Sequence, residues 1–240
     1  MGSTKVKGVV IASKDFKEKD RLITLYTLEQ GKMSCMMRGV RGEKAKLKAA
    51  KEVFSFGEYI IENTKGMNII TQVEVIDSFF ELTRDLDKFY EGCALVDIVG
   101  KISSEESDPR LFIELVKCLK TLCYENVHKL YVLDKFLIRV FESLGYSFIT
   151  DKCSSCKAKL TGKKYFNLDI GEFVCAACKN DTCVLVSDAC FGALKLLSST
   201  DYDRLSSIKL GGDGEKECLR LLEKNFEWRM GKRFISVPLD

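Results

Sequence analysis

The chain has 240 residues, of which 46% are hydrophobic and 30% are charged, with 38 Lys and Arg against 35 Asp and Glu. This composition is ordinary for a globular protein of one or two domains with a sizeable core. The sequence has no apolar run near the roughly eighteen residues of a membrane span and no signal-peptide core, so we expect a cytoplasmic protein without a membrane segment.

Short β-like segments occupy the first part of the chain. Turn and charge clusters separate five runs that are rich in β-branched and aromatic side chains, at residues 5–13, 21–29, 32–40, 52–63 and 67–77. Five strands in so short a stretch predict a small closed barrel in residues 1–80. The OB-fold is the commonest nucleic-acid-binding barrel of this size, and a small barrel with another role is the alternative.

After Asp77 the hydrophobic pattern takes the period of a helix. Predicted helices cover residues 85–103, 107–126, 127–145, 187–199, 202–209 and 214–231. The second of them begins with Asp108 as N-cap and Pro109 in the first turn. The buried stripe of the first is expected to be Leu86, Phe89, Cys93, Val96 and Val99.

A cysteine-rich module at about 151–183 interrupts these helices. The sequence therefore predicts an α+β (mixed) fold with an N-terminal small β-barrel of OB type in residues 1–80. An α-helical domain follows in residues 81–240, and the four-cysteine zinc module is inserted within it. We expect no separate tail or linker, because the helical pattern resumes after the module.

Two Cys-x-x-Cys pairs, Cys153 with Cys156 and Cys175 with Cys178, lie eighteen residues apart. Each pair presents two thiolates to one ion, and tetrahedral Zn²⁺ takes four such ligands in a closed structural site. The intervening segment has β-formers between turn glycines and is expected to fold back as a hairpin. We predict one structural Zn²⁺ at these four cysteines, with no open position for catalysis. Cys183 is an alternative ligand.

Lysines surround the cysteine pairs and are a candidate surface for phosphate: Lys152, Lys157, Lys159, Lys163 and Lys164. The simpler interpretation, which we favour, is that these lysines form a solvated surface on a zinc module whose role is structural. The remaining cysteines show no disulfide framework in their spacing, which indicates a reducing compartment.

A basic segment joins the third and fourth predicted strands. Between Arg38 and Lys51 the only acidic residue is Glu43, and residues 1–80 hold 14 basic against 10 acidic side chains. Lys and Arg displace the counterions condensed on DNA, so this basic loop on a small barrel is a candidate DNA-binding surface. A loop that only confers solubility is the alternative. The candidate DNA-binding residues are Lys19, Arg21, Arg38, Arg41, Lys44, Lys46, Lys48 and Lys51.

Aromatic residues of the barrel are also available for stacking on bases. They are Phe16, Tyr26, Phe54, Phe56 and Tyr59. Because they alternate with polar residues, we expect most of them in the core.

Patterns typical of catalysis are absent from the sequence. The single histidine, His128, lies far along the chain from the cysteines, whereas a zinc deaminase needs a histidine or third cysteine with a nearby catalytic Glu. The Gly-x-x-x-x-Gly-Lys-Ser/Thr loop of one class of ATP sites does not occur either. We therefore predict a protein that is not an enzyme.

Three stretches together resemble a known family. The first is residues 17–42, KEKDRLITLYTLEQGKMSCMMRGVRG, and the second is the pair of Cys-x-x-Cys motifs among helices. The third is residues 222–240, a terminal helix followed by a basic-Ser element with Lys232, Arg233 and Ser236. The order of barrel, helices, zinc insertion and helices is similar to that of the bacterial RecO family of recombination mediators, over essentially the whole chain.

This resemblance implies a function in DNA repair at the nucleoid. RecO-like proteins bind single-stranded and double-stranded DNA, anneal complementary strands, and with RecR help to load RecA onto DNA coated with single-strand-binding protein. They also bind the acidic, aromatic-ended C-terminal tail of that protein. Capture of such a tail requires an apolar groove edged by cations, which we place on the helices between 109 and 145. The candidates are Lys117, Lys120, Lys129, Lys135 and Arg139, and a solvated face is the alternative.

One feature departs from the family pattern. Family members commonly have Ser and Arg soon after the Gly-x-Arg element, where this chain has Lys44, Lys46 and Lys48. Electrostatic binding survives that change, but a bidentate arginine contact does not.

Two other functions compete: a protein-interaction adaptor with secondary DNA contact, and a zinc-ribbon DNA-binding regulator. The second would need a base-reading helix, and the sequence shows no such helix.

Overall fold

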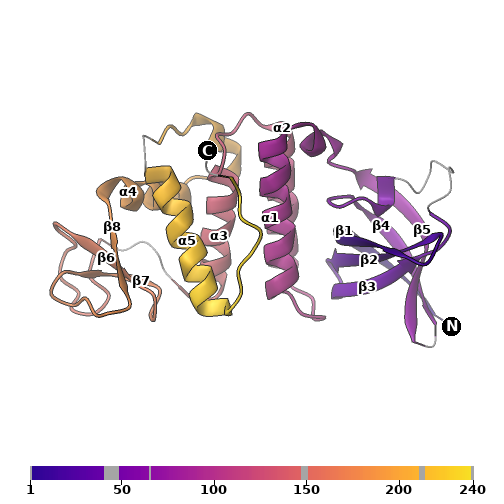
Figure 1. Ribbon diagram of the computed structural model, residues 1–240, viewed down its shortest axis with the longest axis horizontal. Coiled ribbons are helices and arrows are strands. Elements are labelled where there is room, and N and C mark those ends of the chain that lie inside the picture. The colour runs from indigo at the N-terminus through magenta and orange to yellow at the C-terminus, as the bar shows by residue number, and fades with distance from the viewer. Residues whose placement is uncertain (1, 41–48, 65, 147–150, 211–213, 239–240) are drawn as a thin grey trace. The chain divides into compact units, whose positions relative to one another are not determined.

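The computed structural model describes residues 2–40, 49–64, 66–146, 151–210 and 214–238. The chain divides into two compact units, Met1–Tyr124 and Glu125–Asp240. Figure 1 shows the strands and helices of the first unit, and the small strands of the second unit to one side of α4 and α5. Within the described ranges, no helix combines the length and the apolar character that a bilayer crossing requires.

Five strands of the first unit form a closed barrel (Figure 1): β1 (Ser3–Phe16), β2 (Asp20–Thr27), β3 (Gly31–Met37), β4 (Phe56–Thr64) and β5 (Met67–Asp77). Their order around the barrel is β1-β2-β3-β5-β4. β3 and β5 run parallel, and the other neighbouring pairs are antiparallel. The predicted OB-type barrel is therefore confirmed.

The barrel interior is made by side chains that alternate along the strands, because successive residues of a strand point to opposite faces. Val10, Ile23, Leu25 and Tyr59 are among its fully buried members. Gly57 allows β4 and β5 to approach closely, since a Cβ at this position would lie only 2.6 Å from the carbonyl oxygen of Glu74.

The first unit also contains the 3-10 helices η2 (Ala49–Lys51) and η3 (Phe80–Arg84) and the helices α1 (Leu86–Ile102) and α2 (Pro109–Tyr124). The predicted start of α2 is confirmed: the Asp108 carboxylate accepts hydrogen bonds from the backbone N–H groups of Arg110 and Leu111, both at 3.1 Å. These bonds satisfy N–H groups that have no partner within the helix.

Helices α1 and α2 pack against the barrel. The Tyr26 hydroxyl donates to the carbonyl of Asp108 at 3.2 Å, and its ring lies 6.0 Å from that of Phe112. The Lys32 backbone N–H donates to the carbonyl of Ser104 at 2.8 Å. The compact unit therefore extends beyond the barrel, to Tyr124. The boundary near residue 80 that the sequence predicted marks the change from strands to helices. That it also divides two domains stays a prediction.

The predicted buried stripe of α1 is partly wrong. Leu86, in the first turn of the helix, is 69% exposed. Val96 and Val99 are buried as expected. The buried face also contains residues that the periodic pattern missed: Glu91, Gly92, Ala94, Leu95 and Ile98.

The second unit contains α3 (Tyr131–Ser143), β6 (Lys164–Asn167), β7 (Glu172–Cys175), β8 (Cys183–Val186), α4 (Asp188–Ser199), the 3-10 helix η4 (Tyr202–Ser207) and α5 (Gly214–Met230). The three strands form an antiparallel sheet in the order β7-β6-β8. This sheet lies between α3 and α4 in the chain, so the predicted insertion of the cysteine module among helices is confirmed.

Arg229 links α5 to the turn between β6 and β7. Its Nη2 donates to the carbonyl of Leu168 at 2.9 Å, and its Nε donates to Oδ1 of Asn225 at 3.0 Å. The guanidinium carbon lies 3.6 Å from the ring centroid of Tyr146. Gly171, with φ of +69°, passes so close that a Cβ there would lie 2.3 Å from Nη2 of Arg229. The Arg229 side chain thus connects α5 to the β6–β7 hairpin.

Candidate metal centre and nucleic-acid interface

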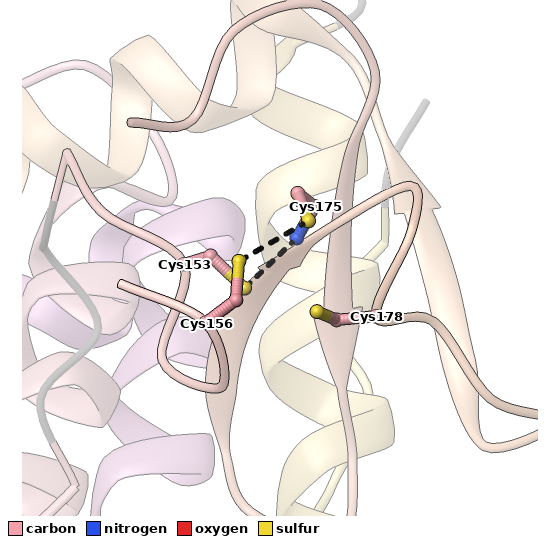
Figure 2. Close-up of side chains that lie close together, drawn as sticks. All are labelled: Cys153, Cys156, Cys175 and Cys178. Atoms are coloured by element: carbon pink, nitrogen blue, oxygen red, sulfur yellow. Dashed lines mark hydrogen bonds between the residues drawn. The ribbon is translucent and has the colours of Figure 1, made fainter. Parts of the chain in front are cut away.

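The four predicted metal ligands lie together. The Sγ atoms of Cys153, Cys156, Cys175 and Cys178 all lie within 4.8 Å of one another. Figure 2 shows the first two on the loop before β6, Cys175 at the end of β7 and Cys178 on the turn that follows. The β6–β7 hairpin returns the chain and places the second pair beside the first, as the sequence predicted.

Backbone hydrogen bonds shape the first Cys-x-x-Cys turn. The N–H of Lys157 donates to the carbonyl of Cys153 at 2.9 Å, and the N–H of Cys153 donates to the carbonyl of Ala158 at 2.7 Å. Lys157 has φ of +62°, which turns the chain immediately after the second sulfur. The N–H of Ser154 donates to the carbonyl of Phe173 at 3.0 Å, which attaches the turn to β7.

The electrostatics of the cluster fit a cation. Burial disfavours the Cys153 thiolate, but backbone N–H groups of Cys156, Cys175 and Ser155 outweigh it and lower the pKa of Cys153 to about 6. The pKa of Cys178 is raised to about 12, because its thiol is hydrogen-bonded to Cys156 and Cys175. Four sulfurs this close cannot all ionise without a positive charge between them. The soft, closed donor set is the type that tetrahedral metal ions occupy.

Cys183 is not part of this cluster. Its Sγ donates to Oδ1 of Asn180 at 3.0 Å and accepts from the Asn180 N–H at 3.4 Å. The flanking lysines lie on the surface of the module, with the exception of Lys164, whose ammonium is paired with Asp188 at 2.6 Å. The exposed ones are Lys152, Lys157, Lys159 and Lys163.

The described DNA-binding candidates lie at one end of the barrel. Asp20, next to Lys19, accepts a hydrogen bond from the N–H of Gly39 at 2.9 Å, which brings the β1–β2 turn beside the end of β3. Arg21 is paired with Met37 in the β2–β3 register. The barrel end therefore carries Lys19, Arg21, Arg38 and Lys51, the last of which donates to the carbonyl of Val40 at 3.3 Å. Arg41, Lys44, Lys46 and Lys48 lie outside the described residues.

These four cations differ in their availability. Lys19 and Arg38 are exposed. Arg21 is partly buried and already engaged: its Nε lies 3.1 Å from Asp15 and its Nη1 lies 3.8 Å from Glu52. Lys19 and Arg38 are thus the more accessible of these candidates, whereas Arg21 is held by acidic partners.

A groove of about 850 Å³ lies on the barrel wall formed by β2, β3 and β5. OB-type barrels commonly bind oligonucleotides on the face of the second and third strands. Here the lining is mostly uncharged, with Thr24, Ser34 and Asn68 among its members. Its charged members are Glu29, Lys32 and Glu105. The groove offers hydrogen-bonding groups but little positive charge. Sequence reasoning missed it, because its residues come from separate strands and loops.

Most of the aromatic stacking candidates are core residues, as expected. Tyr26, Phe54, Phe56 and Tyr59 are all buried. Phe16 is partly exposed, and the Lys17 ammonium lies 5.5 Å from its ring centroid.

The candidates for capture of a partner tail do not share one element. Lys117 and Lys120 are exposed on α2, in the first unit, whereas Lys129 and Arg139 are partly buried in the second. The expectation that Lys135 edges an exposed groove is wrong for this structure. Its side chain is fully buried, and its ammonium donates to the carbonyl of Ser198 at 2.8 Å.

Comparison with known proteins accounts for both parts of the chain. Residues 1–79 match the family described as Recombination protein O N terminal, and residues 83–238 match Recombination protein O C terminal. The chain is 28% identical over 238 residues to the DNA repair protein RecO of Clostridium novyi (strain NT), covering 98% of this chain and 92% of that protein. It is 26% identical over 217 residues to the protein of the same name from Clostridium perfringens (strain 13 / Type A), covering 89% and 87%. With its OB-like barrel, its helices and its four-cysteine cluster, the chain belongs to the RecO family of DNA repair proteins.

Proposed function

We propose that this chain is a non-catalytic recombination mediator. It binds single-stranded and double-stranded DNA, anneals complementary strands, and with RecR helps to load RecA onto DNA coated with single-strand-binding protein. The observation that carries this proposal is the gathering of candidate cations at one end of an OB-like barrel in a RecO-family chain. Its positive surface is contributed by exposed residues such as Lys19 and Arg38.

Annealing on such a surface needs no covalent chemistry. Two DNA strands are polyanions, so a positive surface that contacts both lowers their mutual repulsion and raises the rate at which they meet. Loading of RecA requires a protein that holds the strand and its coating protein together. Contact with the acidic tail of single-strand-binding protein would bind the coating protein. Among the residues that the structure describes, the exposed candidates for this contact are Lys117 and Lys120 on α2.

We also propose that the metal at the four cysteines is Zn²⁺ with a structural role. The three strands of the module are four residues each, too short to bury a core of their own. A structural zinc contributes on the order of 10 kcal/mol to the folding of a small domain of this kind. When bound, the ion cross-links the loop before β6 to the end of β7. The lysines around it stay a solvated surface.

The salt dependence of DNA binding tests the first proposal. If about five phosphates are neutralised on a single strand, the logarithm of the affinity should fall against the logarithm of salt with a slope of roughly −3.5. Reversal of charge at Arg38 and Lys19 should make this slope shallower and slow annealing without changing the fold. The same reversal at Lys209, an exposed lysine of the second unit, is the control and should have little effect. A slope near zero in the unmodified protein would refute DNA binding through this surface.

Charge reversal at Arg38, Arg41, Lys44 and Lys46 together tests the whole basic segment. Unchanged annealing would show that the assignment of this segment is wrong. The mediator role is tested by annealing on DNA coated with single-strand-binding protein, repeated with the tail of that protein deleted. Equal rates on both substrates would refute tail capture while leaving DNA binding in place.

A further inference from the structure

Three aromatic residues line a pocket of about 330 Å³ in the first unit. Phe54 precedes β4, Phe80 begins η3, and Phe89 belongs to α1, so three separate elements bring the rings together. Glu52, Ser78 and Thr83 add polar groups to the lining. The volume is in the range of pockets that bury a small ligand, and the mixture of apolar walls with a few polar groups is typical of them.

The pocket is built at a conformational cost. Phe54 has φ of +78° and Phe79, next to Phe80, has φ of +47°, in a region that bulky residues rarely adopt. Both side chains are buried. Gly92 on α1 makes room for the first ring, since a Cβ there would lie 3.0 Å from Cζ of Phe54. Strained backbone of this kind is concentrated at functional sites.

Phe80 presents its ring to solvent. The residue is 58% exposed, which is unusual for a phenylalanine beside two further rings, Phe54 and Phe89. The guanidinium carbon of Arg84 lies 5.3 Å from the centroid of the Phe80 ring. An exposed ring with a cation next to it is the combination on which single-stranded nucleic acids stack their bases.

The pocket borders the basic end of the barrel. Glu52 lines the pocket and also lies 3.8 Å from Nη1 of Arg21. Lys51 immediately precedes Glu52, and its ammonium donates to the carbonyl of Val40. Val40 is two residues after Arg38, which is exposed at the same end of the barrel. A strand whose phosphates rest on these cations therefore has the aromatic pocket within reach of its bases.

We propose that this aromatic pocket takes one unstacked base of single-stranded DNA. The inference rests on the proposed DNA-binding function and adds a preference for single strands. Every base has a π face, so stacking on Phe80 tolerates any sequence. The Glu52 carboxylate lines the pocket and can accept a hydrogen bond from a ring N–H or an amino group of the base. In a duplex the bases are paired and stacked, so the pocket gives no contact there and only the phosphate contacts remain.

The test compares Phe80→Ala with the unmodified protein, using fluorescence anisotropy on three DNAs of equal length. These are a thymidine oligonucleotide, the same oligonucleotide with abasic sites, and a duplex. We expect Phe80→Ala to weaken binding to the first by at least about fivefold and to leave binding to the other two unchanged. The salt slope should stay the same, because no phosphate contact is lost. Phe80→Trp should retain the affinity, and Ile113→Ala, which truncates another exposed apolar residue of the same unit, should have no effect.

The outcomes separate this inference from the function on which it rests. If Phe80→Ala and the unmodified protein bind the thymidine oligonucleotide equally, with a normal salt slope, the pocket assignment is wrong and the mediator function stands. If the unmodified protein shows no salt-dependent binding to any of the three DNAs, both are refuted. If Phe80→Ala weakens binding only to an acidic peptide ending in an aromatic residue, the pocket is a peptide site and the base assignment fails.

Discussion

Replacement of Arg229 by alanine should strongly destabilise the second unit. The change removes the hydrogen bond to Leu168, the hydrogen bond to Asn225 and the contact with the ring of Tyr146. Leu168 and Asn225 are both buried, so the groups that lose their partner are left away from water. Among the described residues, Arg229 contacts Leu168, Asp169, Asn225 and Tyr146 and none of the four cysteines, which makes the effect separable from metal binding.

The magnitude follows from these contacts. A hydrogen bond from a charged group contributes about 1.5–3 kcal/mol, and a cation over an aromatic ring contributes about 0.5–2 kcal/mol. Because Arg229 is partly exposed, values near the lower limits apply, and the expected loss in the free energy of unfolding is about 3 kcal/mol. For a unit of this size that corresponds to a fall in Tm of roughly 10 °C.

The assay uses the only tryptophan of the chain. Trp228 precedes Arg229 on α5 and is 52% exposed, so its fluorescence reports unfolding of the second unit. The matched control is Arg233→Ala, because the Arg233 side chain is 80% exposed and pairs with Glu227 at 2.7 Å on the surface. We expect no resolvable change in the unfolding midpoint of that control. All variants are compared with metal bound.

A double-mutant cycle with Gly171 sharpens the test. Gly171→Ala introduces a Cβ against the Arg229 guanidinium and places alanine at a left-handed φ, so it should destabilise the unit by about 1–2 kcal/mol or more. In the Arg229→Ala background the clash with the guanidinium is gone, and the effects of the two single changes should sum to more than that of the double variant. If Arg229→Ala shifts the midpoint no more than Arg233→Ala, the proposed linkage has no energetic role.

Three further predictions concern the metal and the glycines. Cys175→Ser should destabilise or aggregate the second unit and lower its unfolding midpoint, and a variant that stays folded but no longer binds DNA would contradict the structural role of the metal. Gly57→Ala should lower the free energy of unfolding of the barrel by about 1–3 kcal/mol, because the added Cβ would lie 2.6 Å from a backbone oxygen of β5. Denaturant unfolding measures this loss, and an unchanged midpoint would show that β4 and β5 can move apart at no cost. Gly192→Ala should instead stabilise the second unit by about 0.5–1 kcal/mol, since this exposed position within α4 has no atom within 4 Å of the added Cβ.

The features that the sequence predicted are those that local patterns encode. The five strands follow from alternation, and Asp108 before Pro109 marks a helix start by its own chemistry. Cysteine spacing predicts a shared metal, because two residues between cysteines fit one turn. Each of these signals depends only on neighbours in the chain.

The features that were missed depend on distant partners. Lys135 resembles a surface cation in the sequence, but its ammonium is buried against the carbonyl of Ser198, more than sixty residues away. The packing of α2 on the barrel rests on Tyr26 reaching Asp108, which no local pattern indicates. The aromatic pocket needs the left-handed φ of Phe54 and the missing side chain of Gly92, and neither is visible as periodicity.

The position of the four cysteines in the chain has a consequence for folding during synthesis. All four ligands lie between residues 153 and 178, and so does the turn at Leu168 that Arg229 contacts. Because chains emerge from the ribosome N-terminus first, the metal cluster can close before α5 has been made. The last helix then docks onto a finished surface. The yield of folded protein should accordingly depend on metal supplied while the chain is being translated, more than on metal added afterwards.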